Sequence, residues 1–193
     1  GPLAPVDVTV TTVENRTITP ALFGIGTIEA RYTYKIGPTA AGRVRQLGVQ
    51  VGDQVKTGQV IGEMDPVDLD ERIRAQEAVV KGAEAQVRET QASQAYAQKQ
   101  AWRYEQLLKV HATSEESAVT YQYELQVAEA SLNSAREELV RARADREGLI
   151  AQRSNLNLVA PVDGLVAARD IEPGTTVVAG QTVVELIDPE SLW

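Results

Sequence analysis

The sequence predicts an α+β fold in which a long antiparallel helical hairpin is inserted into a small β-sandwich. Three observations lead to this prediction. No proline lies between Pro66 and Pro161, and that stretch repeats apolar residues every seven positions. The segments on either side are rich in glycine and resemble each other. Only 5% of the 193 residues are aromatic, so we expect a thin, elongated core.

The N-terminal segment, residues 6–35, has the pattern of β-strands. Val6, Val8 and Val10 alternate with polar residues, and Gly26-Thr27-Ile28 continues the pattern. Such period-two alternation is typical of a strand that buries one face. We therefore expect strands before the sandwich.

The middle of the chain, residues 66–157, predicts a coiled coil. Apolar residues recur at two positions of each heptad, which is the a/d pattern of two packed helices. The first half contributes Ile73, Val80, Ala83, Val87, Ala97, Ala101, Tyr104 and Leu108, with Gln94 as a polar exception. The second half contributes Leu125, Ala128, Leu132, Ala135, Leu139, Ala142 and Leu149. Alanine at about half of the positions allows the two helices to approach closely.

The helix ends follow from capping residues. We expect helices over about 66–110 and 115–156, with Pro66 as the first helical residue. Thr113 or Ser114 can cap the second helix through its hydroxyl. The loop between the helices is short, so they must run antiparallel.

The segments that flank the hairpin repeat each other without a gap. Aligning Gly42 with Gly164 also pairs Val44/Val166, Val49/Ile171, Gly52/Gly174, Val55/Val177, Gly58/Gly180, Gln59/Gln181, Ile61/Val183 and Glu63/Glu185. Glycine tolerates turn conformations that other residues resist. The candidate turn residues are Gly42, Gly52, Gly58, Gly164, Gly174 and Gly180. Neither half can bury its apolar face alone, so we expect the halves to pair.

Composition argues against most catalytic and nucleic-acid functions. The net charge is −8, whereas contacts to phosphates need a surplus of Lys and Arg. Cysteine is absent, which removes thiolate chemistry. A single His, His111, and a single Met, Met64, argue against a metal site. We expect no enzyme activity, no metal, no cofactor and, since no run of about 18 residues is apolar, no membrane span.

The repeated pattern Gly-x-Val…Val-Gly-Asp-x-Val-x-x-Gly-Gln-x-Ile, in residues 42–61, resembles a biotinyl/lipoyl half-motif. Two such halves separated by a coiled-coil hairpin resemble the periplasmic adaptor proteins, also called membrane fusion proteins. The resemblance implies these domains: first strands of an incomplete β-barrel over 6–35, a lipoyl half over 36–65, the hairpin over 66–157, the second lipoyl half over 158–188, and a linker to the barrel over 189–193.

The expected hairpin tip contains a sharper resemblance. Adaptors of resistance–nodulation–division (RND) pumps have the pattern Arg-x-x-x-Leu-x-x-x-x-x-x-Ser there, and this chain has Arg103, Leu107 and Ser114 at that spacing. The resemblance implies that these residues dock onto an outer-membrane channel. An acidic residue common in the family five positions after the serine is replaced here by Val119.

Other residues near the tip have two interpretations each. His111 is interpreted as a polar loop residue, with a pH sensor as the alternative. Trp102 and Tyr104 flank Arg103, and serve either in helix packing or in contacts of an assembly.

The implied function is that of an adaptor between an inner-membrane efflux transporter and an outer-membrane channel. The resemblance implies a periplasmic protein, held at the inner membrane when full-length, whose copies assemble, as hexamers in the family, into a sealed funnel for drugs or other small molecules. The alternatives are an adaptor of a type I secretion or ABC-exporter system and a coiled-coil scaffold unrelated to transport. A lipoyl or biotinyl carrier is not expected, because Asp65-Pro66 stands where the modified lysine would be and Lys56 lies on another turn.

Overall fold

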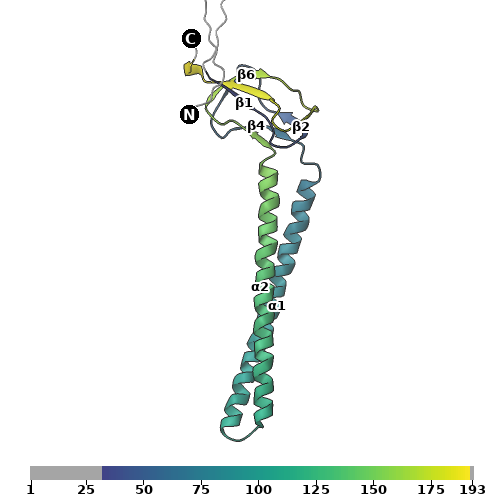
Figure 1. Ribbon diagram of the computed structural model, residues 1–193, viewed down its shortest axis with the longest axis vertical. Helices are drawn as coiled ribbons and strands as arrows, with labels where there is room; N and C mark the ends of the chain where they lie inside the picture. Colours follow the sequence, from purple (N-terminus) through teal and green to yellow (C-terminus); the bar gives the residue numbers. More distant parts are fainter. Residues whose placement is uncertain (1–31, 192–193) are drawn as a thin grey trace, which may run out of the picture. The chain divides into compact units, whose positions relative to one another are not determined.

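A computed structural model describes residues 32–191 (Figure 1). Contacts divide these residues into two units. A β unit contains residues 32–67 and 153–191, and a helical unit contains residues 68–152. The strands expected within residues 6–31 lie outside the described residues.

The helical unit is an antiparallel hairpin of two long helices, α1 (Leu69–Lys109) and α2 (Glu115–Ser154, whose last two residues belong to the β unit). The prediction that Pro66 is the first helical residue is wrong. Val67 adopts a φ of 54°, and its backbone N–H donates to Asp65 Oδ1 at 2.9 Å. This turn delays the start of the helix to Leu69.

Each helix contributes a continuous row of buried and half-buried side chains to the seam, spaced alternately by three and four residues. On α1 the row is Leu69, Ile73, Gln76, Val80, Ala83, Val87, Thr90, Gln94, Ala97, Ala101, Tyr104 and Leu108. On α2 it is Ala118, Tyr121, Leu125, Ala128, Leu132, Ala135, Leu139, Ala142, Arg146 and Leu149. This spacing is that of a left-handed coiled coil. The heptad prediction is confirmed. The observed rows also include three polar residues that the prediction did not list, Gln76, Thr90 and Arg146.

Two of the polar side chains in the seam form hydrogen bonds, one within its own helix and one across the seam. The Thr90 hydroxyl donates to the backbone oxygen of Gln86 at 2.9 Å, within its own helix. Gln76 Nε2 donates to the backbone oxygen of Ala142 on the other helix at 2.9 Å. These bonds let polar side chains occupy positions that are normally apolar.

The β unit is a sandwich of two four-stranded antiparallel sheets. One sheet has the order β1-β8-β6-β3 and the other has the order β5-β4-β2-β7. The strands are β1 (Thr33–Ile36), β2 (Gly42–Leu47), β3 (Gln54–Val55), β4 (Val60–Met64), β5 (Asn157–Val159), β6 (Gly164–Arg169), β7 (Thr176–Val177) and β8 (Val184–Ile187). Strands from before and after the hairpin are neighbours in both sheets, so each four-stranded sheet needs both halves of the chain.

The two halves are related by a pseudo-twofold symmetry that the internal repeat encodes. The N–H of Gly52 donates to the Val166 oxygen at 2.8 Å, and the N–H of the equivalent Gly174 donates to the Val44 oxygen at 2.7 Å. The ladders β2–β4 and β6–β8 both shift register immediately after these two valines. The repeat in sequence is therefore a repeat of hydrogen bonds.

The symmetry extends to strands that the repeat alignment left out. β1 pairs with β8, and β5 pairs with β4. A domain boundary between residues 35 and 36 therefore cuts through β1, which belongs to the sandwich, and a boundary after residue 157 cuts through β5. Both boundaries need correction, because short edge strands with few apolar residues leave little signal in the sequence.

The core of the sandwich lies between the two sheets and is mainly aliphatic. Its buried members are Ile36, Val44, Val49, Val55, Ile61, Met64, Leu158, Ala160, Val166, Val177, Val183, Val184 and Leu186. Burying such side chains contributes about 1.5–3 kcal/mol each for the larger ones. Since these residues come from both halves, the core forms only when the halves combine.

The six glycines assigned to turns separate into two classes. Gly52, Gly58, Gly174 and Gly180 lie in turns at φ values of 97°, 84°, 95° and 81°. Gly42 and Gly164 are instead the first residues of β2 and β6, so their assignment to turns is wrong. At Gly164 a Cβ would lie 2.7 Å from the Ile187 oxygen, so close packing against β8 favours glycine there.

An ion-pair network joins the end of α2 to the sandwich within the β unit. Glu63 on β4 contacts Arg153 Nη2 at 3.3 Å and Arg45 Nη1 at 3.3 Å. The Met64 N–H also donates to the Leu156 oxygen at 2.8 Å. Arg153 in the last turn of α2 and Leu156 just after it are thereby tied to β4.

Candidate docking site at the hairpin tip

The C-terminus of α1 closes with a defined capping motif. The Ala112 N–H donates to the Leu107 oxygen at 2.8 Å, and the His111 N–H donates to the Leu108 oxygen at 3.0 Å. This pair of bonds is a Schellman motif, in which the residue after the C-cap adopts the left-handed conformation. That residue is His111, with a φ of 61°. The interpretation of His111 as a loop residue thus gains a specific structural role, which sequence patterns did not reveal.

The N-terminus of α2 is capped by Ser114. The Ser117 N–H donates to Ser114 Oγ at 3.1 Å, and the two hydroxyls lie 3.0 Å apart. Glu115 and Glu116 follow in the first turn, where negative charge complements the helix dipole. Of the two residues expected as caps, Ser114 forms the cap bond.

The hairpin brings the three candidate docking residues to one end. Arg103 and Leu107 are one turn apart on α1, so they share a face of the helix. Ser114 follows across the connection between Lys109 and Glu115. Arg103 and Ser114 are exposed and Leu107 is half-buried. Arg103 makes no hydrogen bond or ion pair within residues 32–191, so its guanidinium donors remain available.

The aromatic residues beside Arg103 have different roles. The ring of Tyr104 lies in the seam and stacks on Tyr121 with centroids 4.1 Å apart and planes at 24°. A hydrogen bond with Tyr104 raises the pKa of Tyr121 above its ordinary value. Trp102 instead is 64% exposed. Of the two interpretations offered, Tyr104 is a helix-packing residue, whereas Trp102 points away from the seam.

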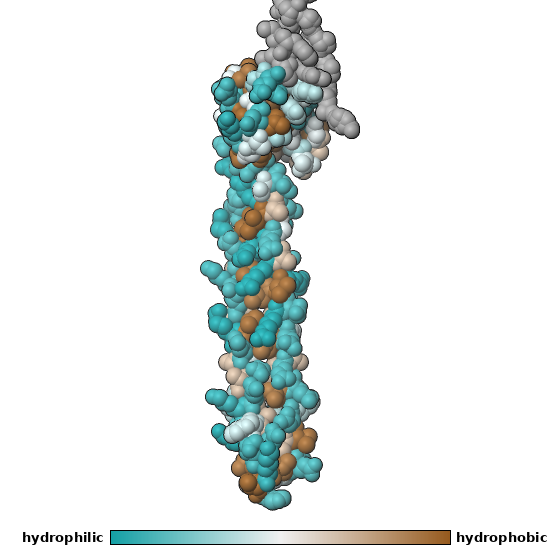
Figure 2. Space-filling model, turned by 90° about the vertical axis from the view of Figure 1, so that its left-hand side faces the viewer, coloured by the Kyte–Doolittle hydropathy of each residue, from teal (hydrophilic) through white to brown (hydrophobic). Residues whose placement is uncertain are grey.

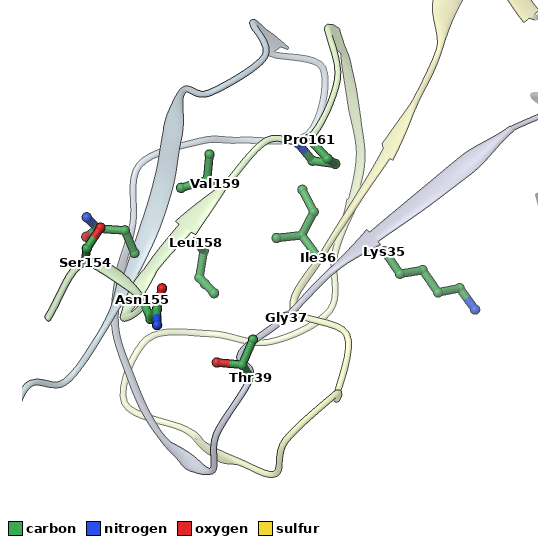
Figure 3. A pocket seen from close by; sticks show the side chains of 10 residues that line it. Lys35, Ile36, Gly37, Thr39, Ser154, Asn155, Leu158, Val159 and Pro161 are labelled. Atoms are coloured by element: carbon green, nitrogen blue, oxygen red, sulfur yellow. The ribbon is translucent and has the colours of Figure 1, made fainter. Parts of the chain in front are cut away.

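The sandwich contains a shallow hollow of about 420 Å³ between the ends of β1 and β5 (Figure 3). Its lining residues are Lys35, Ile36, Gly37, Thr39, Ser154, Asn155, Asn157, Leu158, Val159 and Pro161. Figure 3 shows the Lys35 side chain directed away from the hollow. Apart from Lys35, the lining offers amide and hydroxyl groups and no carboxylate, imidazole or thiol, so it brings together no nucleophile–base pair.

The remaining chemistry of the described part is sparse. Residues 32–191 contain no cluster of three His, Cys, Asp or Glu side chains that could hold a metal ion. None of the helices within those residues combines the length and apolar character needed to cross a membrane. The hairpin tip is therefore the strongest candidate for a functional site in this part of the chain.

The match to a family decides the relationship of the chain to known proteins. The sequence profile described as "RND MFP, barrel-sandwich hybrid domain" matches residues 33–188, which is most of the chain. The chain belongs to the RND membrane fusion protein family. The match begins at the first residue of β1, in agreement with the corrected boundary of the sandwich.

Curated relatives carry names from export systems. The chain is 29% identical to the pyoverdine export membrane fusion protein PvdR of Pseudomonas putida, over 100% of this chain and 50% of the relative. It is 28% identical to the multidrug resistance protein MdtA of Escherichia coli, over 94% of this chain and 40% of the relative. The chain thus spans half or less of the length of these membrane fusion and multidrug resistance proteins.

Solved structures show the same fold. MacA from Actinobacillus actinomycetemcomitans matches 86% of this chain and 52% of its own with a TM-score of 0.77 at 23% identity. The membrane fusion protein Spr0693 from Streptococcus pneumoniae matches 86% of this chain and 65% of its own with a TM-score of 0.59 at 17% identity. The predicted fold class, an α+β sandwich with an inserted hairpin, is confirmed.

Proposed function

We propose that the chain is the sandwich and hairpin part of a periplasmic adaptor that connects an inner-membrane efflux transporter to an outer-membrane channel. The observation that carries this proposal is the exposed Arg103 beside Leu107, with the cap Ser114, at the free end of a long hairpin. Helices of 41 and 40 residues extend about 60 Å, a length suited to bridging. The longer protein is held at the inner membrane.

The docking chemistry follows from the three side chains. Arg103 can donate several hydrogen bonds to carbonyl or carboxylate oxygens of the channel. Leu107 is half-buried and adds apolar area beside them. The Ser114 hydroxyl fixes the first turn of α2, which holds the connection in one conformation. The site contributes positioning and contact area without a catalytic step.

The exported substrate passes through a conduit that several copies form together, six in the assembled pump. The names of the relatives, pyoverdine export and multidrug resistance, support small molecules as substrates. In the same proposal, residues 6–31 and 189–193 belong to a β-barrel domain that a longer chain completes.

The test is binding of the outer-membrane channel by the hairpin. Arg103→Ala and Leu107→Ala should each weaken site-specific cross-linking to the channel about fivefold or more, as expected for interface anchors worth over 1 kcal/mol. Arg88→Ala is the matched control, since Arg88 is an exposed arginine on the same helix, about 22 Å from Arg103. Circular dichroism should show unchanged helicity in all three variants.

Two results would contradict the proposal. Wild-type cross-linking in the Arg103→Ala, Leu107→Ala double variant would remove the docking assignment. Copurification with an ABC ATPase rather than an RND transporter would instead support the alternative function, an adaptor of a type I secretion or ABC-exporter system. The match to the RND membrane fusion protein family supports an RND transporter as the partner.

A further inference from the structure

Two tyrosine rings, one from each helix, meet face to face in the seam near the tip. The centroids of Tyr104 on α1 and Tyr121 on α2 lie 4.1 Å apart, with the ring planes at 24°. This separation is shorter than the about 4.5–7 Å of most aromatic pairs. A hydrogen bond joins the two side chains, and it holds the ends of the rings together because the hydroxyl is the only polar group of each. The Cε carbons beside the two hydroxyls therefore lie opposite each other.

The helical unit lacks the side chains that oxidants usually attack first, which are thiols and thioethers. The chain has no cysteine, and its one methionine, Met64, is buried in the sandwich. In residues 68–152, phenol and indole rings are consequently the groups that lose an electron most easily. They gather toward the tip, at Tyr96, Trp102, Tyr104, Tyr121 and Tyr123.

The stacked pair is accessible to a small molecule, and each ring already has its reaction partner. Both rings are half-buried, because a seam between only two helices is open along its edges. Figure 2 shows hydrophobic side chains reaching the surface along the hairpin. Tyr96 and Tyr123 are each 65% exposed, so they can meet a tyrosine of another molecule. Tyr104 and Tyr121 are instead held against each other.

We propose that Tyr104 and Tyr121 form a site of oxidative modification, at which a diffusible one-electron oxidant joins the two rings into a dityrosine. Each phenol gives one electron to the oxidant and one proton to the solvent, so two phenoxyl radicals form side by side. Their unpaired electrons extend to the Cε carbons. One Cε of each ring then combines with the other to form a carbon–carbon bond.

The coupled product becomes aromatic again by proton transfer alone. Each joined Cε loses its hydrogen to the solvent as a proton, and each ring oxygen takes a proton back, which restores two phenols. The chain has then lost two hydrogen atoms in all, and the oxidant has gained two electrons. Peroxyl radicals and the oxidised haem of a peroxidase belong to the required class of oxidant.

The new bond closes a loop that contains the whole tip. The C-cap of α1, the N-cap of α2 and the connection between them lie inside it, and Arg103 lies directly outside. Closing a loop of this length lowers the population of the unfolded form roughly a hundredfold. The modification therefore fixes the alignment of the two helices at the tip, as a disulfide does in chains that have cysteine. This role needs no transport function, so the two proposals can fail independently.

Trypsin digestion and mass spectrometry test the proposal, because the two tyrosines fall in different peptides. Cleavage after Arg103, Lys109 and Arg136 gives the peptides 104–109 and 110–136. The chain is oxidised with photoexcited tris(bipyridine)ruthenium and persulfate, without channel or transporter. We expect the two peptides joined, at their summed mass less two hydrogen atoms. In an equal mixture of isotope-labelled and unlabelled chains, both peptides of a pair should carry the same label, since coupling within a chain is favoured about a thousandfold over coupling between micromolar chains. Randomly mixed labels, or no joined peptides, would overturn the proposal.

Phenylalanine variants identify the reacting residues, because each keeps its ring and loses only the hydroxyl. Tyr104→Phe and Tyr121→Phe should each abolish the joined peptides. Tyr96→Phe and Tyr123→Phe are the matched controls, since they remove exposed phenols nearby, and they should leave the yield unchanged. Joined peptides that persist in Tyr104→Phe, or that disappear in Tyr123→Phe, contradict the assignment. Oxidised wild type should also unfold at a higher denaturant concentration than oxidised Tyr104→Phe, and equal midpoints would exclude the stabilising role.

Discussion

Asp163 Oδ1 accepts two hydrogen bonds from Thr57, one from the backbone N–H at 2.7 Å and one from the hydroxyl at 2.8 Å. The two residues belong to opposite halves of the repeat, so this contact joins the halves. At the positions that the pseudo-twofold symmetry makes equivalent, the chain has Ala41 and Ala179. The contact therefore exists once, and the two halves are not interchangeable.

The Asp163 contact predicts a specific dependence of stability on pH. The hydrogen bonds from Thr57, the backbone bond first, hold the pKa of Asp163 below its ordinary value of 3.8. A carboxyl group whose pKa is lower in the folded state stabilises the fold above its unfolded pKa, and this stabilisation is lost as the pH falls through the folded value. Asp163→Ala should thus lower the unfolding midpoint at pH 7, with a difference from wild type that shrinks below about pH 4. Denaturant unfolding across pH 2.5–7 measures this, with Thr57→Ala as a partner variant; a difference independent of pH would exclude the ionised carboxylate as the cause.

Replacing the paired glycines at the starts of β6 and β2 should have unequal effects. At Gly164 a Cβ would lie 2.7 Å from the Ile187 backbone oxygen, whereas at Gly42 it would lie 3.5 Å from the end of the Met64 side chain. Gly164→Ala should therefore destabilise the sandwich by about 1–3 kcal/mol, as overpacking does, since backbone cannot move aside easily. Gly42→Ala is the matched control and should change stability by less than about 1 kcal/mol. Chemical denaturation compares the two, and equal losses would contradict the close approach of β6 to β8.

Removing the cap of α2 should weaken the hairpin. Ser114→Ala deletes the acceptor for the Ser117 N–H and should cost about 1 kcal/mol of stability. Ser114→Asp keeps an N-cap acceptor, so it should retain most of the stability while replacing the hydroxyl. Thermal unfolding followed by circular dichroism measures the cap. If channel binding falls in the alanine variant and survives in the aspartate variant, the serine acts through the cap; loss of binding in both variants assigns it to the contact.

His111→Gly should stabilise the tip. The left-handed conformation at φ 61° costs a residue with a Cβ about 1–2 kcal/mol, and glycine avoids that cost while adding entropy to the unfolded chain. A net gain of up to about 1 kcal/mol is expected. Val110→Gly is the control, since Val110 has a φ of −107° and should gain nothing. Docking by His111→Gly that matches wild type at pH 5 and pH 8 would exclude the pH-sensor alternative, and a less stable variant would contradict the capping role.

The sequence by itself determined the architecture of this protein, because its strongest signals are periodic. The heptads predicted the seam, and the matching glycines and valines predicted the paired halves. The four-residue spacing of Arg103 and Leu107 in a predicted helix placed them one turn apart. Patterns of this kind report which side chains must be buried, and burial is the main contribution to the fold.

Only the tertiary structure decided the features that depend on approach between distant backbones. It moved the start of α1 from Pro66 to Leu69, placed β1 in the sandwich and assigned Gly164 to close packing against Ile187. It also aligned α1 with α2 through the stacked rings of Tyr104 and Tyr121. A sequence records the spacing of residues along each helix, but the offset between two helices is fixed only by the packing of their side chains against each other.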